Sequence, residues 1–315
     1  MKTFLSMLIL LYTPQFLRAE PVVLQTPSGV LYGTLELPRV KIKKVPVALL
    51  VSGSGATDRN GNTLSLGGAN NSLQYLAESL ASRGIASLRF DKRGVGQSAK
   101  AVADESTLRF KTYIDDAVSW ARQLRLDKRF STLTIVGHSE GALIALMASR
   151  EVRADACVSV AGIGRPAGQV LLEQLKPQLS PELFAQSQDI MRSLTKGNTV
   201  ESTPTELQTL FRPTVQPYLV SWFALDAARE IKKLAIPILI AQGTTDIQVS
   251  VADAKLLKAA QPQAQLLIVN GMNHILKNVP NNRAAQIASY TDATLPVAKQ
   301  LVDGIARFIR TVQKR

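Results

Sequence analysis

Short runs rich in apolar residues alternate with longer amphipathic segments along most of this chain, beginning near residue 47. Mainly apolar runs are typical of strands that helices cover on both faces. The predicted strands are 47–51, 85–90, 133–136, 157–160, 236–240 and 266–269. The predicted helices are 72–83, 113–126, 141–150, 251–260 and 296–312. This alternation predicts an α/β fold with a mostly parallel, doubly wound sheet.

Two segments depart from the alternation. Near the amino terminus, apolar runs at 22–24 and 30–37 flank a Pro-Ser-Gly turn and predict an antiparallel strand pair. The strand 157–160 is the sixth in the chain when the amino-terminal pair is counted. After it, residues 163–226 are helical in pattern, with proline-containing helix starts at 180–182 and 203–206. Because an insert at the carboxyl edge of such a sheet lies over the ligand crevice, we interpret 163–226 as a helical lid. The alternative is a bundle packed away from the site.

The first 19 residues have the form of a signal peptide. Lys2 precedes the apolar run 4–11, which is too short to span a bilayer, and Ala19 provides a small residue for cleavage. We therefore expect residues 1–19 to be removed, residues 20–315 to form one enlarged domain, and the protein to be secreted or periplasmic. A buried first helix or an uncleaved anchor is the alternative interpretation.

A candidate nucleophile lies between a predicted strand and a predicted helix. The sequence Gly137-His138-Ser139-Glu140-Gly141 follows the apolar run 133–136 and precedes a segment rich in small residues. A Gly-x-Ser-x-Gly sequence in this context predicts a tight turn that exposes the serine hydroxyl at the carboxyl edge of the sheet. The alternative is a structural turn that only needs small residues.

A serine nucleophile needs a base and a group that orients this base. Of the two histidines, His138 adjoins Ser139, and its side chain is expected to point away from the serine. His274 follows the last predicted strand, so by elimination it is the predicted base. Asp246, just beyond the strand 236–240, is the predicted orienting acid, and Asp253 in the following helix is its competitor.

Acyl transfer also requires N–H donors for an oxyanion. The backbone N–H of Glu140, directly after the nucleophile, is one predicted donor. The other is the N–H of Ser54 in the glycine-rich loop Ser52-Gly53-Ser54-Gly55, which follows the strand 47–51. The alternative is that this loop is merely flexible.

The composition excludes several function classes. The chain has 315 residues, 46% of them hydrophobic and 19% charged, which is enough for a large core. Its net charge is +13, but the basic residues are dispersed, so we expect no nucleic-acid partner and no stable membrane insertion. With one cysteine, Cys157, and two histidines, the sequence predicts no internal disulfide, no metal site and no cofactor. It predicts no particular oligomeric state.

The chain resembles α/β-hydrolases of the bacterial serine esterase type. The matching segments are 53–59, 91–98, 137–141, 243–246 and 272–274, in the expected order. The resemblance implies an α/β-hydrolase fold, a helical cap after the sixth strand, and ester hydrolysis through an acyl-serine intermediate, with Ser139, Asp246 and His274 as the triad. It implies a structural role for the loop 91–98. Ser52 departs from the family, since many relatives carry histidine there.

The leading hypothesis is therefore a carboxylesterase acting on a small-molecule ester. The alternatives are another activity of the same fold, such as a peptidase, thioesterase, perhydrolase or lyase, and a non-catalytic binder of a small ligand. The segment 163–226 carries many apolar side chains, among which Phe211 and Trp222 are candidate substrate contacts. Because no acidic cluster there offers an anchor for a peptide amino terminus, we expect an uncharged ester as substrate instead of a peptide. Since the apolar side chains are expected to form an acyl pocket, we expect short-to-medium acyl groups of roughly two to eight carbons.

Overall fold

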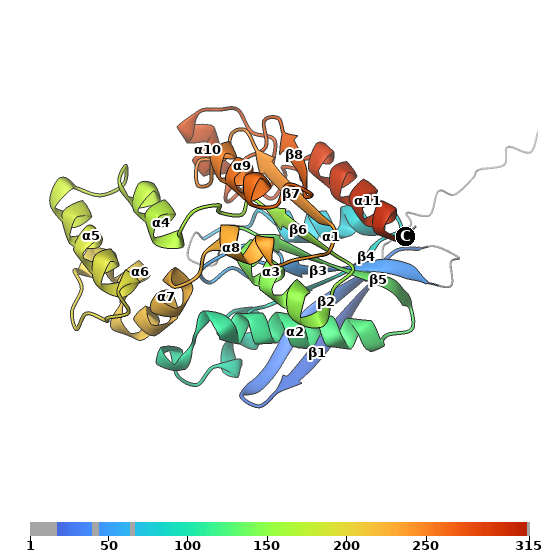
Figure 1. Cartoon of the computed structure of the whole chain (residues 1–315), viewed down its shortest axis with the longest axis horizontal. Coiled ribbons are helices and arrows are strands. Elements are labelled where there is room, and N and C mark those ends of the chain that lie inside the picture. Colours follow the sequence, from blue (N-terminus) through green and yellow to red (C-terminus); the bar gives the residue numbers. More distant parts are fainter. Residues whose placement is uncertain (1–17, 40–43, 64–66, 314–315) are drawn as a thin grey trace, which may run out of the picture.

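The computed structural model describes residues 18–39, 44–63 and 67–313. In these ranges eight strands form one sheet, in the order β1-β2-β4-β3-β5-β6-β7-β8 (Figure 1). The strands are β1 (Arg18–Thr26), β2 (Gly29–Leu37), β3 (Val45–Val51), β4 (Ala86–Phe90), β5 (Phe130–His138), β6 (Ala156–Val160), β7 (Ile238–Gly243) and β8 (Gln265–Val269). Pairing is antiparallel from β1 through β2 to β4 and parallel from β4 to β8.

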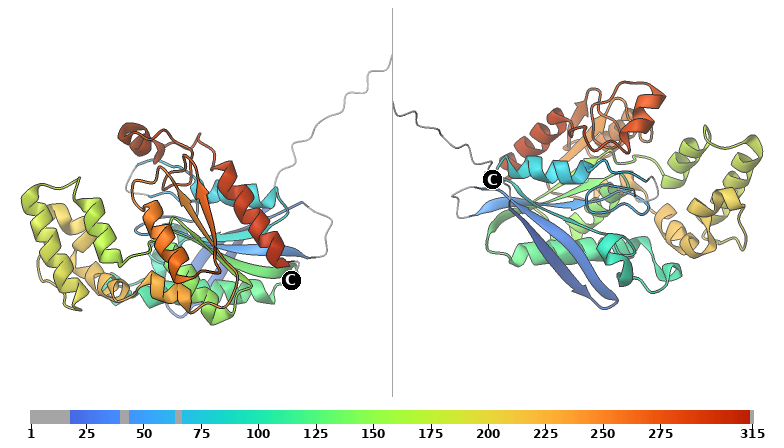
Figure 2. Two further views of the ribbon diagram at one scale, coloured as in Figure 1. Left: turned by 45° about the horizontal axis from the view of Figure 1, so that its top comes forward. Right: turned by 180° about the vertical axis from the view of Figure 1, so that it is seen from behind.

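Helices cover both faces of this sheet (Figure 2). Those outside the segment 163–226 are α1 (Ser72–Ala81), α2 (Phe110–Leu126), α3 (Glu140–Val152), α8 (Ala227–Lys232), α9 (Val251–Ala260), α10 (Arg283–Ser289) and α11 (Lys299–Gln313). One core forms between the sheet and α2, α3, α8 and α9, and a second forms under α1 and α11. Every residue of β3 is buried, as expected for a strand between two helical layers. The predicted α/β class and doubly wound sheet are confirmed.

The structure differs from the sequence-based prediction mainly near the carboxyl terminus. Helix α10 was not predicted, because its seven residues are too few to establish a periodic pattern. Helix α11 begins at Lys299 instead of Pro296. Val297 pairs with Lys277 in an isolated β-bridge, so the chain there is still extended and the helix starts later.

Residues 163–226, called the insert below, contain α4 (Ala167–Leu175), α5 (Pro181–Thr195), α6 (Gln208–Phe211) and α7 (Gln216–Phe223). These helices gather at one end of the molecule, on the left of Figure 1. The first predicted helix start is confirmed: the Ser180 side chain accepts a hydrogen bond from the N–H of Leu183, and Pro181 occupies the first turn. At the second, a 3-10 helix begins at Thr205 and continues directly into α6 at Gln208, so the position is confirmed. The predicted cap is wrong, because Pro204 is the residue before the helix and no side chain caps it.

Two sets of contacts hold the ends of the insert against the sheet domain. At its start, Asp253 of α9 accepts hydrogen bonds from the N–H of Gly164 at 3.1 Å and from Nε of Arg165 at 3.0 Å. Near its end, the hydroxyl of Ser221 accepts from the N–H of Phe110, and the ring of Trp222 stacks on that of Phe110 at 5.9 Å. The first and last helices of the insert, α4 and α7, are therefore fixed close to the sheet edge.

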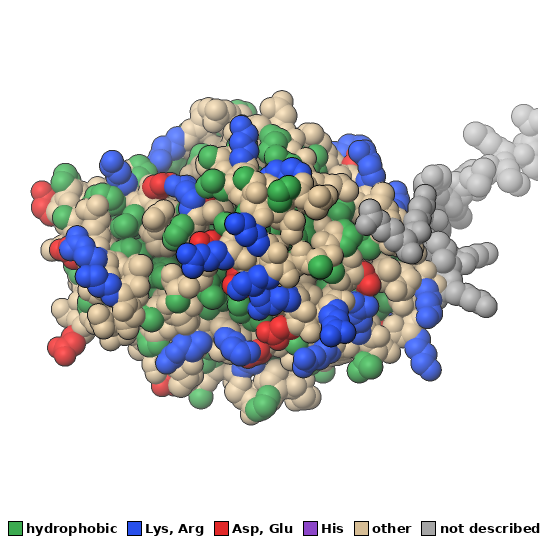
Figure 3. All heavy atoms as spheres, in the orientation of Figure 1, with side chains coloured by type: hydrophobic (Ala, Val, Ile, Leu, Met, Phe, Trp, Pro, Cys, Tyr) green, Lys and Arg blue, Asp and Glu red, His purple; other side chains and the backbone are tan. Residues whose placement is uncertain are grey.

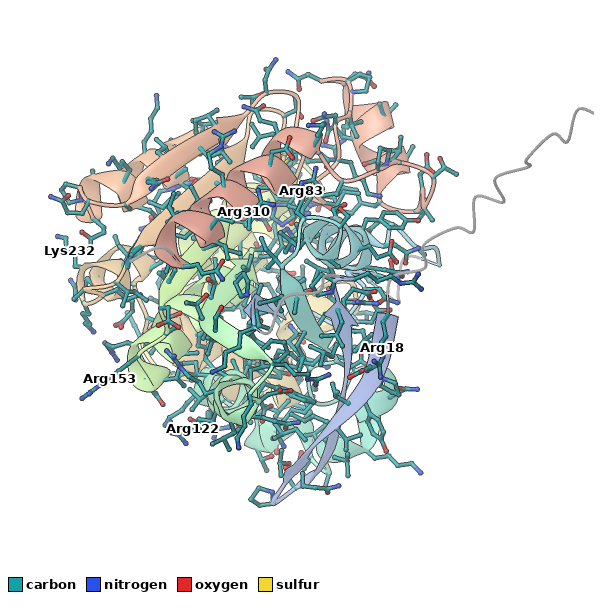
Figure 4. The ribbon with its side chains drawn as sticks, turned by 90° about the vertical axis from the view of Figure 1, so that its right-hand side faces the viewer. Arg18, Arg83, Arg122, Arg153, Lys232 and Arg310 are labelled. Atoms are coloured by element: carbon teal, nitrogen blue, oxygen red, sulfur yellow. The ribbon has the colours of Figure 1, made fainter. Side chains whose placement is uncertain are left out.

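Charged side chains are dispersed over the surface. In Figure 3, Lys and Arg side chains are spread over the face shown, with fewer acidic side chains and scattered apolar ones among them. On the face opposite the insert, the six labelled cations of Figure 4 come from or just beyond six different elements: Arg18, Arg83, Arg122, Arg153, Lys232 and Arg310. In the described ranges, no helix combines the length and apolar character needed to cross a membrane.

The predicted signal peptide falls almost entirely on residues 1–17, which lie outside the described residues. Its last two residues, Arg18 and Ala19, begin β1 and pair with Leu37 and Glu36 of β2. Both are exposed at the edge of the sheet. Cleavage after Ala19 would therefore shorten an edge strand without removing a buried side chain.

Candidate active site

Ser139 occupies the sharp turn between β5 and α3. Its backbone has φ 55° and ψ −121°, a conformation that is strained for a residue with a side chain. The turn is so tight that a Cβ at Gly137 would lie 2.0 Å from the carbonyl oxygen of Gly141. A Cβ at Gly141 would lie 2.4 Å from the carbonyl oxygen of Val51. Both glycines are therefore required by close backbone approach, and the turn presents Ser139 at the carboxyl edge of the sheet.

Ser139, His274 and Asp246 form a continuous hydrogen-bonded chain. The hydroxyl of Ser139 lies 3.1 Å from Nε2 of His274, and Nδ1 of His274 lies 2.9 Å from Oδ2 of Asp246. The three residues come from three loops, each at the carboxyl end of a parallel strand: β5, β7 and β8. The side chains of His274 and Asp246 are both at least 90% buried. This geometry matches a nucleophile, its base and the acid that orients the base.

Three N–H groups besides that of His274 donate hydrogen bonds to the carboxylate of Asp246. It accepts hydrogen bonds from the N–H groups of Gln248 and Val249 at 2.8 and 2.9 Å, and from the side-chain amide of Gln242 at 3.0 Å. Burial opposes ionisation of Asp246, but the contact with His274 and the N–H donors outweigh it and lower the pKa of the carboxyl group. Asp246 is therefore an anion at neutral pH and can hold Nδ1 of His274 in its protonated form.

Asp253, the competing acid, lies away from this chain. Its carboxylate binds the guanidinium of Arg165, the N–H of Gly164 and the hydroxyl of Ser250. It anchors the start of the insert to α9 and has no contact with His274. The structure thus brings Asp246, and not Asp253, to the histidine.

The two predicted oxyanion donors flank the nucleophile. Ser54 and Glu140 line the same small pocket as Ser139. Neither backbone N–H donates a hydrogen bond to a protein acceptor within the described parts of the chain. Gly53 explains the close approach of the loop, because a Cβ there would lie 3.2 Å from Cβ of Ser139. Two free N–H groups beside a serine hydroxyl are what an oxyanion hole needs.

His138 has a role that the sequence did not reveal. It was expected only to point away from Ser139, but its ring lies 4.9 Å from the ring of His274, and its Nε2 donates to the carbonyl oxygen of His274 at 2.7 Å. Burial, together with the neighbouring His274, lowers the pKa of His138 to about 3. His138 is therefore neutral and fixes the loop that carries the predicted base.

This buried histidine makes stability depend on pH. The pKa of His138 is about 3 in the folded chain and near 6.5 in an unfolded chain. Below pH 6.5 the unfolded state therefore binds a proton that the folded state does not bind. We expect the free energy of unfolding to fall by up to about 1.4 kcal/mol per pH unit as the pH drops from 6.5 toward 5. In His138→Gln, which keeps an amide donor, this contribution should be absent. Urea unfolding of both proteins at several pH values tests it, and parallel curves would contradict it.

The pocket at Ser139 is small and mainly apolar. Its volume is about 20 Å³, little more than one water molecule requires. Its lining residues come from the two oxyanion loops, the insert and the loop that carries Asp246: Ser54, Ser139, Glu140, Ile163, Ala167, Val170, Leu171, Gln174, Trp222, Gln248 and Val249. Trp222, a predicted substrate contact, is among them.

Phe211, the other predicted substrate contact, does not line this pocket. Its side chain is completely buried and belongs to the core shared by the insert and the sheet domain. The short helix α6 directs the ring inward, and the carbonyl of Phe211 accepts a hydrogen bond from Gln216 of α7. The expectation for Phe211 is corrected: it packs the insert.

No group of three or more His, Cys, Asp or Glu side chains within the described ranges is placed to hold a metal ion. Cys157 lies in β6 with its side chain buried. Burial raises the pKa of its thiol to about 12, so it stays protonated and unreactive at neutral pH.

A family model described as "Serine aminopeptidase, S33" matches residues 66–280, more than half of the chain. The matched range includes Ser139, Asp246 and His274. The chain belongs to the serine aminopeptidase S33 family. This family has the α/β-hydrolase fold, which agrees with the strand order of the sheet and with the resemblance seen in the sequence.

One curated relative is esterase EstD of Thermotoga maritima. It is 29% identical over 268 residues, which make up 84% of this chain and 62% of EstD. The chain thus spans less than two thirds of that relative.

Solved structures show the same fold at lower identity. Est1E of Butyrivibrio proteoclasticus with bound ferulic acid superposes with a TM-score of 0.64 at 14% identity, covering 93% of this chain and all of Est1E. An esterase of Pyrococcus furiosus gives a TM-score of 0.60 at 15% identity, covering 94% of this chain and 91% of that one. At identities this low, the structural likeness shows that this protein shares the α/β-hydrolase fold.

Proposed function

We propose that this protein is a serine hydrolase that cleaves carboxylic esters through an acyl-serine intermediate. The observation that carries the proposal is the hydrogen-bonded chain from Ser139 through His274 to Asp246, with two backbone N–H groups beside the serine that donate to no acceptor in the described residues. EstD and the Pyrococcus furiosus neighbour are both named as esterases, which supports the choice of an ester as substrate.

In the first half of the reaction, Oγ of Ser139 attacks the ester carbonyl while Nε2 of His274 takes its proton. The N–H groups of Ser54 and Glu140 bind the resulting oxyanion. Asp246 stabilises the imidazolium and holds its Nδ1–H. His274 then gives its proton to the alcohol oxygen, the C–O bond breaks and the alcohol leaves.

In the second half, water replaces the alcohol. His274 takes a proton from this water, which attacks the acyl carbon of the acyl-serine, and the same two N–H groups bind the second oxyanion. The proton returns to Oγ of Ser139 as the carboxylic acid is released. No residue other than those already placed at the site is required.

An ester fits the pocket better than a peptide with a free amino terminus. An aminopeptidase needs an anion to hold the substrate's ammonium group, but the carboxylates nearest the site already have partners. Asp246 binds His274, and Glu173 binds Arg165. We expect turnover of p-nitrophenyl acetate to exceed that of aminoacyl p-nitroanilides by orders of magnitude. Comparable kcat/KM values would favour a peptidase, and no turnover of either would favour a non-catalytic binder.

The size of the pocket at Ser139 favours short acyl groups, at the lower end of the range expected from the sequence. Trp222→Ala should enlarge this pocket and raise kcat/KM for hexanoyl relative to acetyl p-nitrophenyl esters by about tenfold. Phe211→Leu is the matched control, because it alters packing inside the insert while leaving the pocket wall intact. An unchanged acyl-length profile in Trp222→Ala would place the acyl group elsewhere.

Export is the second part of the proposal. It rests on the basic residue, short apolar run and small residue within residues 1–19. When the full chain is expressed in a bacterium with an outer membrane, we expect it in the periplasmic or secreted fraction with Glu20 as its first residue. Intact-mass spectrometry measures this, and a cytoplasmic protein that retains Met1 would contradict it.

A further inference from the structure

A large groove adjoins the small pocket at Ser139. It has a volume of about 780 Å³, within the range of small-molecule sites, and lies between α4 of the insert, the loop after β7 and α10. Gln174, Gln248 and Val249 line both the groove and the pocket, so the two spaces are neighbours with a common wall. A substrate attached to Ser139 would enter the groove by passing these three side chains.

The groove lies on the acid side of the triad. Asp246 and the residues that follow it, Ile247 to Ser250, form part of its wall. Residues of the insert and of the loop after β7 line both spaces, but Ile163, Val170 and Trp222 line the pocket and not the groove. Because the alcohol oxygen must lie against Nε2 of His274 to receive its proton, the alcohol leaves on the histidine and acid side. The acyl chain then occupies the small pocket.

We propose that this groove is the alcohol subsite, and that the substrate is an ester of a short acid with a bulky alcohol or phenol. This inference rests on the proposed function. The groove suits such a group, since its wall combines exposed apolar side chains, Ile247 and Ile287, with polar ones. Tyr290 and Gln248, hydrogen-bonded to each other at 2.6 Å, offer polar atoms to oxygen substituents of the alcohol.

Two series of esters test the assignment: one varies the alcohol of an acetate ester, and the other varies the acyl group of a methyl ester. Because the alcohols have similar acidity, a difference in kcat/KM within the first series reports the size of the alcohol and not its quality as a leaving group. We expect kcat/KM to rise at least tenfold from methyl acetate to hexyl or 2-phenylethyl acetate. From methyl acetate to methyl octanoate it should not rise. If acyl lengthening helps as much as alcohol lengthening, the groove is not the alcohol subsite. If no ester in either series is hydrolysed, the proposed function itself fails.

A substitution in the groove tests the same point independently. Ile287 on α10 is 54% exposed, so Ile287→Asp should fold normally. We expect it to lower the ratio of kcat/KM for hexyl acetate to that for methyl acetate by about tenfold. Leu126→Asp is the matched control, because Leu126 is an exposed leucine at the end of α2 outside the groove. Equal ratios in wild type and both variants would overturn the assignment.

A different observation identifies a positioning residue. Lys92, in the loop after β4, is 2% exposed. Its Nζ donates to the carbonyl oxygen of Gly53 at 2.5 Å and lies 3.3 Å from the carboxylate of Glu140. These are the two oxyanion loops, so one buried ammonium joins both.

We infer that Lys92 positions the oxyanion hole. The carbonyl of Gly53 and the N–H of Ser54 belong to one planar peptide unit, so a cation fixed on the oxygen fixes the direction of the N–H. It also polarises the peptide and makes this N–H a stronger donor. On the other side, the ion pair with the Glu140 side chain holds the residue whose backbone supplies the second donor. The loop 91–98, which the resemblance marked as structural, thus supports the reaction through Lys92.

The double variant Lys92→Met/Glu140→Gln removes the pair without leaving a single buried charge. We expect kcat to fall by about 10- to 100-fold, less than the loss of one oxyanion donor, while KM stays within about threefold. Affinity for a trifluoromethyl ketone, whose hemiketal carries an oxyanion, should fall by the same factor as kcat. A fall in kcat without weaker binding of the trifluoromethyl ketone would contradict the inference.

A second buried ion pair provides the control for folding effects. Arg89 of β4 and Glu36 of β2 lie 3.1 Å apart and are comparably buried. Arg89 donates a hydrogen bond to Asn60, further along the loop after β3, but neither partner has a hydrogen bond or ion pair with residues 52–55 or with Glu140. Arg89→Met/Glu36→Gln should lower Tm by a similar amount but keep kcat. If both double variants lower kcat equally, Lys92 has only a structural role.

Discussion

We expect Ser139→Ala to abolish ester turnover, lowering kcat by a factor on the order of 10⁶, and to leave the fold intact. In the proposed mechanism the oxygen of this hydroxyl forms the acyl bond, so no other group replaces it. Alanine retains the Cβ that the tight turn already accommodates, and the Ser139 side chain caps no helix. The measurement is kcat with p-nitrophenyl acetate, together with circular dichroism and thermal unfolding.

Two companion variants make this result specific. Ser159→Ala removes a buried hydroxyl in the neighbouring strand β6 that has no partner in the described structure, so it should keep full activity. The double variant Ser139→Ala/His274→Ala should be no less active than Ser139→Ala alone, because members of a triad act as one unit. Wild-type turnover in Ser139→Ala would disprove its role as nucleophile.

We expect Asp246→Asn to lower kcat by a factor on the order of 10⁴ while KM changes little. An asparagine that keeps the N–H donors of Gln248 and Val249 on its carbonyl oxygen turns its NH₂ group toward His274. The histidine then carries its proton on Nε2 and can no longer accept one from Ser139. The pH–rate profile and kcat of the variant measure this loss.

Asp253→Asn is the matched control for this substitution. Its carboxylate anchors Gly164 and Arg165 at the start of the insert. We expect a lower Tm and at most a several-fold change in kcat. If Asp253→Asn were the more damaging of the two variants, Asp246 would not be the orienting acid.

Much of the fold was predictable because it depends on patterns that tertiary contacts do not change. A continuous apolar run such as 47–51 has only one stable place, between two helical layers. The positions of Ser139, Asp246 and His274 followed from the same logic, since each comes just after a predicted parallel strand and such strands end at one edge of the sheet. Their juxtaposition at hydrogen-bonding distance needed the structure.

Other features depend on contacts that no periodicity encodes. Phe211 and Trp222 are both aromatic residues of the insert, but only the packing of α6 and α7 decides which one faces the pocket. The contact of His138 with the His274 loop joins residues 136 positions apart. Likewise, the pairing of Lys92 with Glu140 depends on the spatial order β4-β3-β5, in which two strands distant in sequence flank β3.

Covalent trapping of the nucleophile is the most direct test of the proposed mechanism. The protein is treated with a p-nitrophenyl alkylphosphonate bearing a short alkyl group, then analysed by intact-mass spectrometry and peptide mapping. We expect one phosphonyl group per chain, on Ser139, with loss of esterase activity in proportion to labelling and no labelling of Ser139→Ala. Labelling of another residue, or full activity in the labelled protein, would contradict the acyl-serine mechanism.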